Sequence, residues 1–383
     1  VCASVPAGAS CGTHEAVELR DGGNRLEGLG VLKSIDIIEN KIAPMLIGKE
    51  PNVVQMDIML LELDNTPNKS KLGANTMLAV SIAICKAQAL AESLELYELI
   101  AYICSFELVA LPCPLINILN GGLHADNNFS VQEIMIMPLN QPSFRSALEV
   151  GFTIFHGLKK LLHKQGKLTA IGDEGGFAPI FTDLQQALNL VMEAIEQYGN
   201  GNPVMIALDI ASSHFYDQKT DTYLWYGKQI NKQELIEIYQ QLTTKYPIYS
   251  IEDGLTETDW NGWEQLNELL GSQAKIIGDD IFATNPERIW HGIEEDTAQG
   301  AIIKPNQIGT VTETLQAAKL CKEYNWDVIV SHRSGETNDS FIADLAVGIS
   351  AEQMKAGGCT RGERMAKYNR LLKIEDQLMM KSE

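Results

Sequence analysis

The chain has 383 residues, more than one ordinary domain needs, so a (β/α) barrel of roughly 250 residues would leave room for a second domain. Its 45% hydrophobic and 21% charged residues are typical of a globular protein. Fifty acidic and 30 basic residues give a net charge of −20, which argues against nucleic acid or an anionic membrane as the main partner. A small anionic substrate remains compatible, provided that metal ions and a few cations reverse the field locally.

The cysteines and the apolar segments favour a cytoplasmic location. The seven cysteines are scattered and contain no C-x-x-C pair, as in a reduced protein with free thiols. The first ten residues lack the charged and apolar regions of a signal peptide. The most apolar segment, 96–119, is interrupted by charged residues and prolines, so it predicts a buried linker and strand instead of a membrane span.

The N-terminal part of the chain is predicted to be an α-rich small domain over residues 1–105. Residues 1–13 contain a loop of small residues, which either allows a close approach to a ligand or forms an ordinary flexible turn. Helical periodicity follows in three segments, 30–46, 56–64 and 75–93.

A barrel is expected over residues 106–383, with an irregular beginning. Two apolar runs, 115–119 and 131–137, precede a helix over 143–165 that has a serine N-cap. The segment 169–176 then carries Glu174 into a glycine-rich turn. Two strands before the first helix depart from simple βα alternation.

Five further apolar runs each end in polar or ionisable side chains. They span residues 204–209, 249–253, 275–280, 301–304 and 328–334. Unbroken β-branched runs are typical of parallel strands buried on both faces. Helical patterns separate them, at 231–246, 260–270, 286–295 and 312–325. Such repetition predicts a closed (β/α) barrel whose carboxyl strand ends carry the chemistry.

Three of these strand ends supply carboxylates: Asp209, Glu252 and Asp279. Hard oxygen ligands of this kind suit Mg²⁺, Mn²⁺ or Ca²⁺, and the absence of Cys and His from the trio argues against zinc. A single acid is more often a solvated strand-end residue. Three in register, followed by Lys304 at the equivalent position, favour a metal site.

Lys304 ends an otherwise apolar strand, where partial desolvation and a nearby dication would lower its pKa and make it a general base. Such a base beside a metal predicts proton abstraction α to a carboxylate. Glu133 and Glu174 arrive from the other side of the barrel and would supply an acid for a leaving hydroxide, because two nearby carboxylates raise one another's pKa and keep one of them protonated. Arg333 with Ser334 offers a phosphate-binding fork, and Lys355 adds a cation at the expected last strand.

These motifs together resemble the enolases of bacterial type, over the whole chain. The matching segments are 8–15, 120–128, 131–133, 172–176, 208–213, 250–253, 278–280, 303–304, 306–309 and 331–337. Each would be weak alone, but the set is highly specific.

The resemblance implies a small α+β N-terminal domain, a barrel of ββαα(βα)₆ order, and a homodimer or a dimer-based octamer. It also implies reversible dehydration of 2-phosphoglycerate to phosphoenolpyruvate, a glycolytic step, with a small phosphorylated carboxylate as substrate. A lysine base with Mg²⁺ is already known for this superfamily.

The resemblance also assigns roles to individual residues. Glu174 resembles the general acid, assisted by Glu133, and Lys304 resembles the general base. Two Mg²⁺ ions are implied, one held by the acidic trio and a second held with the help of Ser10. The implied substrate contacts are Gln132, His124, Lys304, His332, Arg333, Ser334 and Lys355.

Some positions depart from the family pattern. The chain starts at what resembles the third strand, so the N-terminal domain is expected to be incomplete. Cys11 stands where threonine is usual, Pro305 removes a backbone donor after the base, and residues 356–359 lack the usual Thr-Gly pair. None of these changes removes a catalytic side chain.

Two other readings compete. Another lyase, racemase or cycloisomerase of the superfamily would be expected to lack the Ser10 loop, the Gln132–Glu133 pair and the 331–334 cluster. A non-catalytic adhesin or structural protein would be expected to lack an acid, a base or a metal ligand, and none is missing. A secondary cell-surface or secreted pool remains compatible with catalysis.

Overall fold

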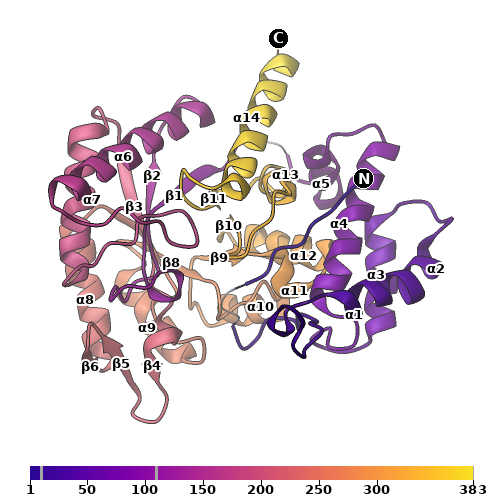
Figure 1. The fold of residues 1–383 in the computed structure, drawn as a ribbon, viewed down its shortest axis with the longest axis horizontal. Helices are drawn as coiled ribbons and strands as arrows, with labels where there is room; N and C mark the ends of the chain where they lie inside the picture. Colours follow the sequence, from indigo (N-terminus) through magenta and orange to yellow (C-terminus); the bar gives the residue numbers. More distant parts are fainter. Residues whose placement is uncertain (9–11, 108–110, 383) are drawn as a thin grey trace.

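A computed structural model describes residues 1–8, 12–107 and 111–382, with a helical N-terminal part beside a closed barrel (Figure 1). The barrel strands run in the order β1-β11-β10-β9-β8-β7-β3-β2. Their bounds are β1 (Cys113–Asn120), β2 (Glu133–Pro138), β3 (Val204–Asp209), β7 (Ile248–Glu252), β8 (Lys275–Gly278), β9 (Gly300–Ile303), β10 (Asp327–Ser331) and β11 (Gln353–Lys355).

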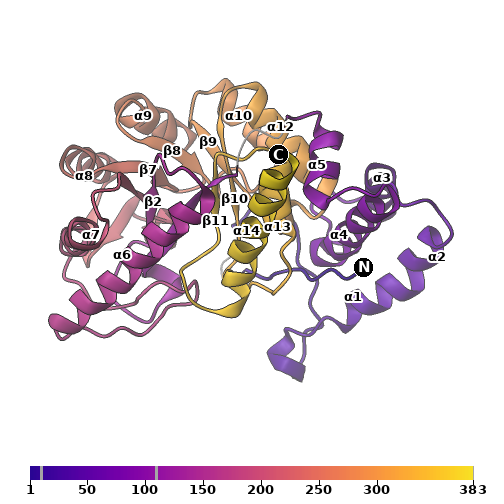
Figure 2. The same cartoon turned by 90° about the horizontal axis from the view of Figure 1, so that it is seen from above.

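The element order confirms the ββαα(βα)₆ barrel. Two helices follow β2, and each later barrel strand is followed by one principal helix, which lies on the outside (Figure 2). The helices are α6 (Phe144–Lys164), α7 (Leu184–Tyr198), α8 (Lys232–Lys245), α9 (Trp260–Leu270), α10 (Pro286–Glu294), α12 (Val311–Glu323), α13 (Phe341–Gly348) and α14 (Gly362–Ser382). A short α11 (Pro305–Ile308) lies between β9 and α12.

Strand β2 is antiparallel to both of its neighbours, β1 and β3. It follows β1 without an intervening helix, and only a crossover connection would make the two strands parallel. The first residue of β2, Glu133, therefore pairs with Asn120 at the end of β1 and with Asp209 at the end of β3. This reversal brings Glu133 to the mouth formed by the carboxyl ends of the other strands.

The interior of the barrel is packed with apolar side chains. One buried cluster comes from alternate positions of the strands: Leu115, Met135, Met137, Ala207, Ile277, Ile302 and Ile329. A larger cluster fills the layer between the strands and the helices. The barrel is thus a filled core below a polar mouth, as expected for this architecture.

The three predicted N-terminal helices are present, the first as a succession of short pieces. The helices are α1 (Leu32–Ile37), a π-helical turn (Ile38–Ile42), α2 (Ala43–Leu46), α3 (Val53–Asp64) and α4 (Ala74–Ala91). They lie on the side of the barrel that carries α11 to α13 (Figure 2). The predicted boundary at residues 105 and 106 falls between the last N-terminal helix and β1 and stays a prediction.

The strands that the resemblance implies for this domain do not form a sheet within residues 1–8 and 12–105. The extended segment 15–21 is hydrogen-bonded to a loop instead. Val17 N–H donates to the Asn68 carbonyl over 2.8 Å, and Ala74 N–H donates to the Val17 carbonyl over 2.8 Å. The isolated bridge of this part pairs Ala7 with Gly335 of the barrel.

The prediction of a linker and strand over 96–119 is wrong for its first part, which is helix α5 (Leu96–Cys104). Glu98, which interrupts the apolar run, belongs to a capping box with Glu95 at the start of this helix. The helix packs its apolar side chains against α13. A capping residue was thus interpreted as a break in the hydrophobic pattern.

A small sheet, which the sequence analysis did not predict, is inserted between β3 and α8. It consists of β4 (Tyr216–Asp217), β5 (Thr222–Trp225) and β6 (Lys228–Ile230).

Among the described helices, α4 is long and apolar enough to cross a membrane by length and composition alone, but half of it is buried in the fold. It packs against α3, α5 and α12, so it is weak evidence for a span.

Candidate active site

The mouth of the barrel holds a polar cavity of about 20 Å³, room for about one water molecule. Most of the predicted site residues in the described part of the chain line it: His124, Gln132, Glu133, Glu174, Asp209, Asp279, Lys304, His332, Arg333, Ser334 and Lys355. Glu252 does not line the cavity, and Ser10 lies outside the described residues. The cavity is small because ion pairs cross it.

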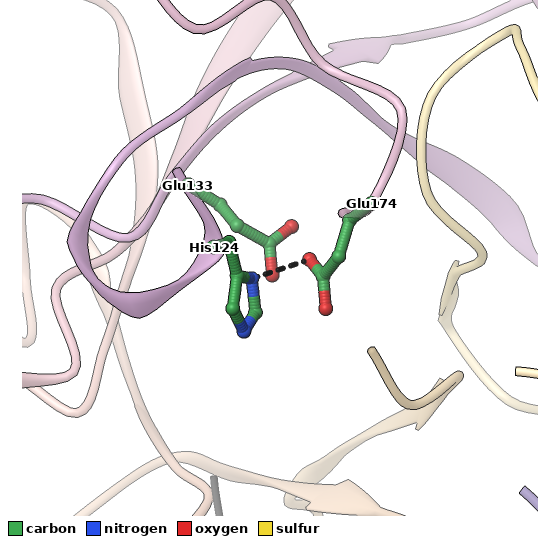
Figure 3. A group of neighbouring side chains, drawn as sticks. All are labelled: His124, Glu133 and Glu174. Carbon is green, nitrogen blue, oxygen red and sulfur yellow. Dashed lines mark ion pairs between the residues drawn. The ribbon is translucent and has the colours of Figure 1, made fainter. Parts of the chain in front are cut away.

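One group of side chains joins the loop after β1, the start of β2 and the glycine-rich turn (Figure 3). His124 Nδ1 lies 3.2 Å from Glu174 Oε2. The amide of Asn117, within β1, donates to Glu133 Oε2 over 2.7 Å and to Glu174 Oε2 over 3.4 Å. His332 Nε2 lies 3.7 Å from the same Glu174 oxygen. The two carboxyl groups therefore form one buried pair flanked by two imidazoles.

The two carboxyls of this pair differ in proton affinity. Burial, together with the charge of Glu174, raises the pKa of Glu133 well above its usual range. Burial also raises the pKa of Glu174, but His124 and His332 outweigh it and hold that pKa well below the usual range. In the ligand-free site, Glu133 therefore holds a proton more readily than Glu174, whose carboxylate lies beside two imidazoles.

Lys355 lies among three carboxylates at the centre of the site. Its Nζ atom is 2.9 Å from Glu133 Oε1, 2.8 Å from Asp209 Oδ2 and 2.9 Å from Glu252 Oε1. Burial lowers the pKa of Lys355, but these carboxylates raise it well above its ordinary value. One ammonium is thus shared by the acids of β2, β3 and β7.

Lys304 directly follows β9, and its ammonium donates to Asp279 Oδ2. The other oxygen of Asp279 accepts from Gln307 Nε2 over 2.8 Å. Burial lowers the pKa of Lys304, but the Asp279 carboxylate outweighs burial and raises it. The expected lowering is therefore not found in the ligand-free site, because the metal-binding candidate Asp279 pairs with the lysine.

Arg333, after β10, forms a bidentate ion pair with Glu15, and both side chains are buried. Its Nη1 donates to Glu15 Oε2 over 2.8 Å and to Asn306 Oδ1 over 3.2 Å, and its Nη2 donates to Glu15 Oε1 over 3.1 Å. A guanidinium held in this way has the geometry that binds a carboxylate or phosphate by two parallel hydrogen bonds.

The sequence assigned no role to four residues of this site: Glu15, Asn117, Asp253 and Arg364. Asn117 left a signal, because it is the polar residue within the apolar run 115–119. Asp253 follows a predicted ligand, and its carboxylate accepts the backbone N–H of Asp279 over 2.8 Å. No local sequence pattern marks Arg364 as a site residue, because its partners lie in loops that are distant in sequence.

The residues present fit a divalent cation. Asp209, Glu252 and Asp279 are buried oxygen donors on neighbouring strands β3, β7 and β8. Burial and the charge of Asp209 raise the pKa of Glu252, and a bound cation would favour its ionised form. Gln132 donates to Asp209 over 3.2 Å, while its own buried Oε1 has no hydrogen-bond partner within the described part of the chain. Buried carboxylate and amide oxygens of this kind suit Mg²⁺.

Among the described residues, the possible metal ligands that lie closest together are not the predicted trio. Two groups have ligand atoms within 4.8 Å of one another: His124, Glu133 and Glu174, and Asp253, Asp279 and Asp280. Asp209 and Glu252 are held by Lys355 instead. The structure thus brings the predicted ligands to one mouth, with lysine ammonium groups between them.

The fold and the site define a class: a (β/α)₈ barrel enzyme whose buried acids and lysines line the carboxyl ends of the strands. Family comparison makes the class specific. The family model for the enolase C-terminal TIM barrel domain matches residues 108–383, and that for the enolase N-terminal domain matches residues 1–100. The chain belongs to the enolase family. It is therefore a hydro-lyase of the enolase superfamily, and the family implies a divalent metal and a small carboxylate substrate.

Proposed function

We propose that the protein catalyses the reversible, Mg²⁺-dependent dehydration of 2-phosphoglycerate to phosphoenolpyruvate, a step of glycolysis and gluconeogenesis. One observation carries the proposal. Lys304 follows β9 and Glu133 begins β2, and these strands are four apart in either direction around the closed barrel. A basic and an acidic group therefore face one cavity from opposite sides, as removal of a proton and of a hydroxide from adjacent carbons requires.

In this proposal, Lys304 removes the proton from Cα of the substrate. Glu133 has the raised pKa of the pair and is hydrogen-bonded to Glu174, so in this proposal it passes a proton to Glu174. Glu174 then donates that proton to the departing hydroxyl, which leaves as water. Asn117 contacts both carboxyls and holds them together. His124 and His332 stabilise the carboxylate that Glu174 becomes.

Substrate binding relies on the remaining cations and polar groups. Arg333 and Ser334 bind the phosphate, and Gln132 and Lys355 contact the carboxylate end. Arg333 is supported in this role by its paired donors, which already hold the Glu15 carboxylate in a bidentate manner. Because the cavity has room for about one water molecule, the substrate must displace this pairing or widen the site.

We propose two Mg²⁺ ions per site, one held by Asp209, Glu252 and Asp279 and the other with the help of Ser10. When bound, divalent metal supplies positive charge that stabilises the negative charge developing on the substrate carboxylate. The support is the set of buried carboxylate oxygens from neighbouring strands at one mouth of the barrel.

The test of the proposed function is a spectrophotometric assay. The conjugated product absorbs in the ultraviolet, so incubation with 2-phosphoglycerate and Mg²⁺ should give rising absorbance, and phosphoenolpyruvate should give the reverse change. Lys304→Ala is the matched negative control. Absence of conversion by a folded, metal-loaded protein, with conversion of another hydroxy acid, would replace the substrate assignment.

We further propose that the protein forms a homodimer or a dimer-based octamer. Five exposed apolar side chains lie within residues 26–35 of the N-terminal part: Leu26 by 65%, Leu29 by 61%, Val31 by 38%, Leu32 by 52% and Ile35 by 44%. Apolar side chains concentrated in one exposed segment are unfavourable in contact with water and favour an interface there. Light scattering coupled to gel filtration should give twice the mass of the chain or a multiple of it, and a strict monomer would contradict the proposal.

We propose a cytoplasmic location with a possible secondary surface or secreted pool. The described cysteines are free thiols, three of them buried, and burial raises the pKa of Cys85, Cys104 and Cys321 to about 12. Free thiols suit a reducing compartment. Cell fractionation followed by immunoblotting tests this, and a protein found mainly outside the cell would refute it.

A further inference from the structure

Arg364 of α14 is a buried arginine whose charge is directed at two loops of the site. Its side chain is 1% exposed. Its Nη1 donates to Nδ1 of His332 and, over 2.6 Å, to the Arg333 carbonyl. Its Nη2 donates to the carbonyls of Ser334 over 2.7 Å and Asp173 over 3.1 Å. The guanidinium thus links the loop after β10 to the turn that carries Glu174.

The contact with His332 determines which ring nitrogen carries a proton. A guanidinium has donors and no acceptor, so the Nδ1 atom that it faces must accept and must be unprotonated. The proton of a neutral ring then resides on Nε2. That atom is buried, lies 3.7 Å from Glu174 Oε2 and makes no hydrogen bond to the described residues. The geometry therefore directs an N–H of His332 toward the carboxyl group of Glu174.

The surroundings of His332 also keep its ring neutral. Burial lowers the pKa of His332, Glu174 opposes this effect, and the cationic groups of Arg364, Lys355 and Lys304 lower the pKa further. The net result is a pKa well below the ordinary value. Arg364 therefore disfavours a doubly protonated ring in two ways. Its positive charge repels a second positive charge, and its N–H group occupies the Nδ1 lone pair that a second proton would need.

We propose that Arg364 is a positioning residue, which fixes His332 as the neutral Nε2–H tautomer and so makes it a hydrogen-bond donor to Glu174. Its value for catalysis rests on the proposed function. When Glu174 gives its proton to the leaving hydroxyl, the new carboxylate needs donors, and His332 in this tautomer is one. The other tautomer would present a lone pair to that carboxylate and destabilise it.

The direct test is ¹⁵N NMR of the ring nitrogens in the ligand-free protein. His332→Gln identifies the His332 signals by difference among the seven histidines. The expected spectrum shows an unprotonated Nδ1 and a protonated Nε2 over the neutral pH range. A protonated Nδ1, or a doubly protonated ring, in the wild-type protein overturns the proposal without any variant of Arg364.

Variants then test the cause. Arg364→Met should allow the Nδ1–H tautomer, whereas Arg364→Lys should retain part of the wild-type pattern, because it keeps a cationic donor on the same helix. Lys367→Met is the matched control, since Lys367 is also buried on α14 but donates to Thr337 and does not contact His332. An unchanged tautomer in folded Arg364→Met, or the same change in Lys367→Met, contradicts the assignment.

The kinetic readout separates positioning from general stability. Arg364→Met should lower kcat on the order of 10–100-fold, as loss of an orienting partner typically does, with little change in KM. Added methylguanidinium should restore part of kcat in this variant and none in Lys304→Ala. If Arg364→Met does not fold, Arg364→Lys and the wild-type spectrum still decide the question. If 2-phosphoglycerate proves not to be the substrate, the NMR result is unaffected, so the two proposals fail separately.

Discussion

Arg333 and Glu15 form a buried bidentate ion pair across 318 residues of sequence, with hydrogen bonds of 2.8 Å and 3.1 Å. The pair joins the loop after β10 to the N-terminal loop, and its carboxylate holds the guanidinium donors that the proposal assigns to the substrate phosphate. Anion binding and this ion pair therefore compete for the same donors.

This competition gives the first prediction. Glu15→Gln should lower the melting temperature of the ligand-free protein, because a buried guanidinium loses its counter-charge, at a typical cost of about 3–5 kcal/mol. The same variant should gain more stability than wild type from inorganic phosphate, since the anion replaces the lost charge. Thermal melting with increasing phosphate measures both effects. An equal phosphate response in the two proteins would show that Glu15 and the anion use different donors.

The second prediction concerns metal dependence. Asp209, Glu252 and Asp279 are buried acids, so chelation should abolish turnover and Mg²⁺ should restore it. A cation at a hundred times its Kd should stabilise the fold by about 2.7 kcal/mol, and Asp209→Asn should show a smaller increase in melting temperature. Full activity in excess chelator would contradict the metal assignment.

The third prediction separates the base from the acid. Lys304→Ala should lose both turnover and exchange of the substrate Cα proton with solvent. Glu174→Gln should lose turnover but keep that exchange, because the lysine still removes and returns the proton. Each loss in turnover should be on the order of 10²–10⁴-fold. NMR of 2-phosphoglycerate in heavy water measures the exchange, and the opposite pattern in the two variants would reverse the roles.

The fourth prediction concerns the central ammonium. Lys355→Met removes the positive charge shared by Glu133, Asp209 and Glu252. The metal-free variant should lose about 3–5 kcal/mol of stability at neutral pH, because the buried acids then lose the positive charge that compensates them. Urea unfolding measures the loss, and Lys355→Arg, which keeps the charge, is the control. Mg²⁺ should recover part of the stability in Lys355→Met, and an equal loss with and without Mg²⁺ would refute this account.

The fifth prediction concerns the contact between the N-terminal helices and the barrel. Asp57 of α3 is fully buried and accepts from Thr312 of α12, over 2.9 Å from the backbone N–H and 2.7 Å from the hydroxyl. Thr312→Val removes the hydroxyl donor and should cost about 1–3 kcal/mol at neutral pH. Thr244→Val, at an exposed position of α8, is the control.

The pH dependence of this cost follows from Asp57. Burial raises the pKa of Asp57 above the ordinary 3.8, so the folded protein binds this proton more tightly than the unfolded chain does. The stability that this proton contributes is complete below the pKa of the unfolded state and is lost as pH rises through the pKa of the folded state. The difference between wild type and Thr312→Val should therefore grow with pH across that window in urea unfolding. A difference independent of pH would mean that the hydroxyl does not interact with the carboxylate.

The sequence by itself determined the repeating unit and the chemical character of the strand ends. Apolar runs that end in Asp209, Glu252 and Lys304 are local patterns, because burial on both faces favours β-branched residues and the strand end faces the polar mouth of the barrel. The order ββαα(βα)₆ came from resemblance and agrees with the barrel. Helix α5 was missed because a capping residue and an interruption of an apolar run look alike in one dimension.

Only the tertiary structure decided which charges meet. Lys355 contacts acids of three other strands, Arg333 pairs with Glu15, and Arg364 reaches two loops from the last helix. These partners are far apart in sequence and become neighbours when the barrel closes, so no local pattern encodes them. The same closure set the proton affinities: the pKa of Glu174 is lowered beside two imidazoles, that of Glu133 is raised by burial, and Asp279 raises the pKa of Lys304. A pKa depends on the charges within a few ångströms and on burial, and folding sets both.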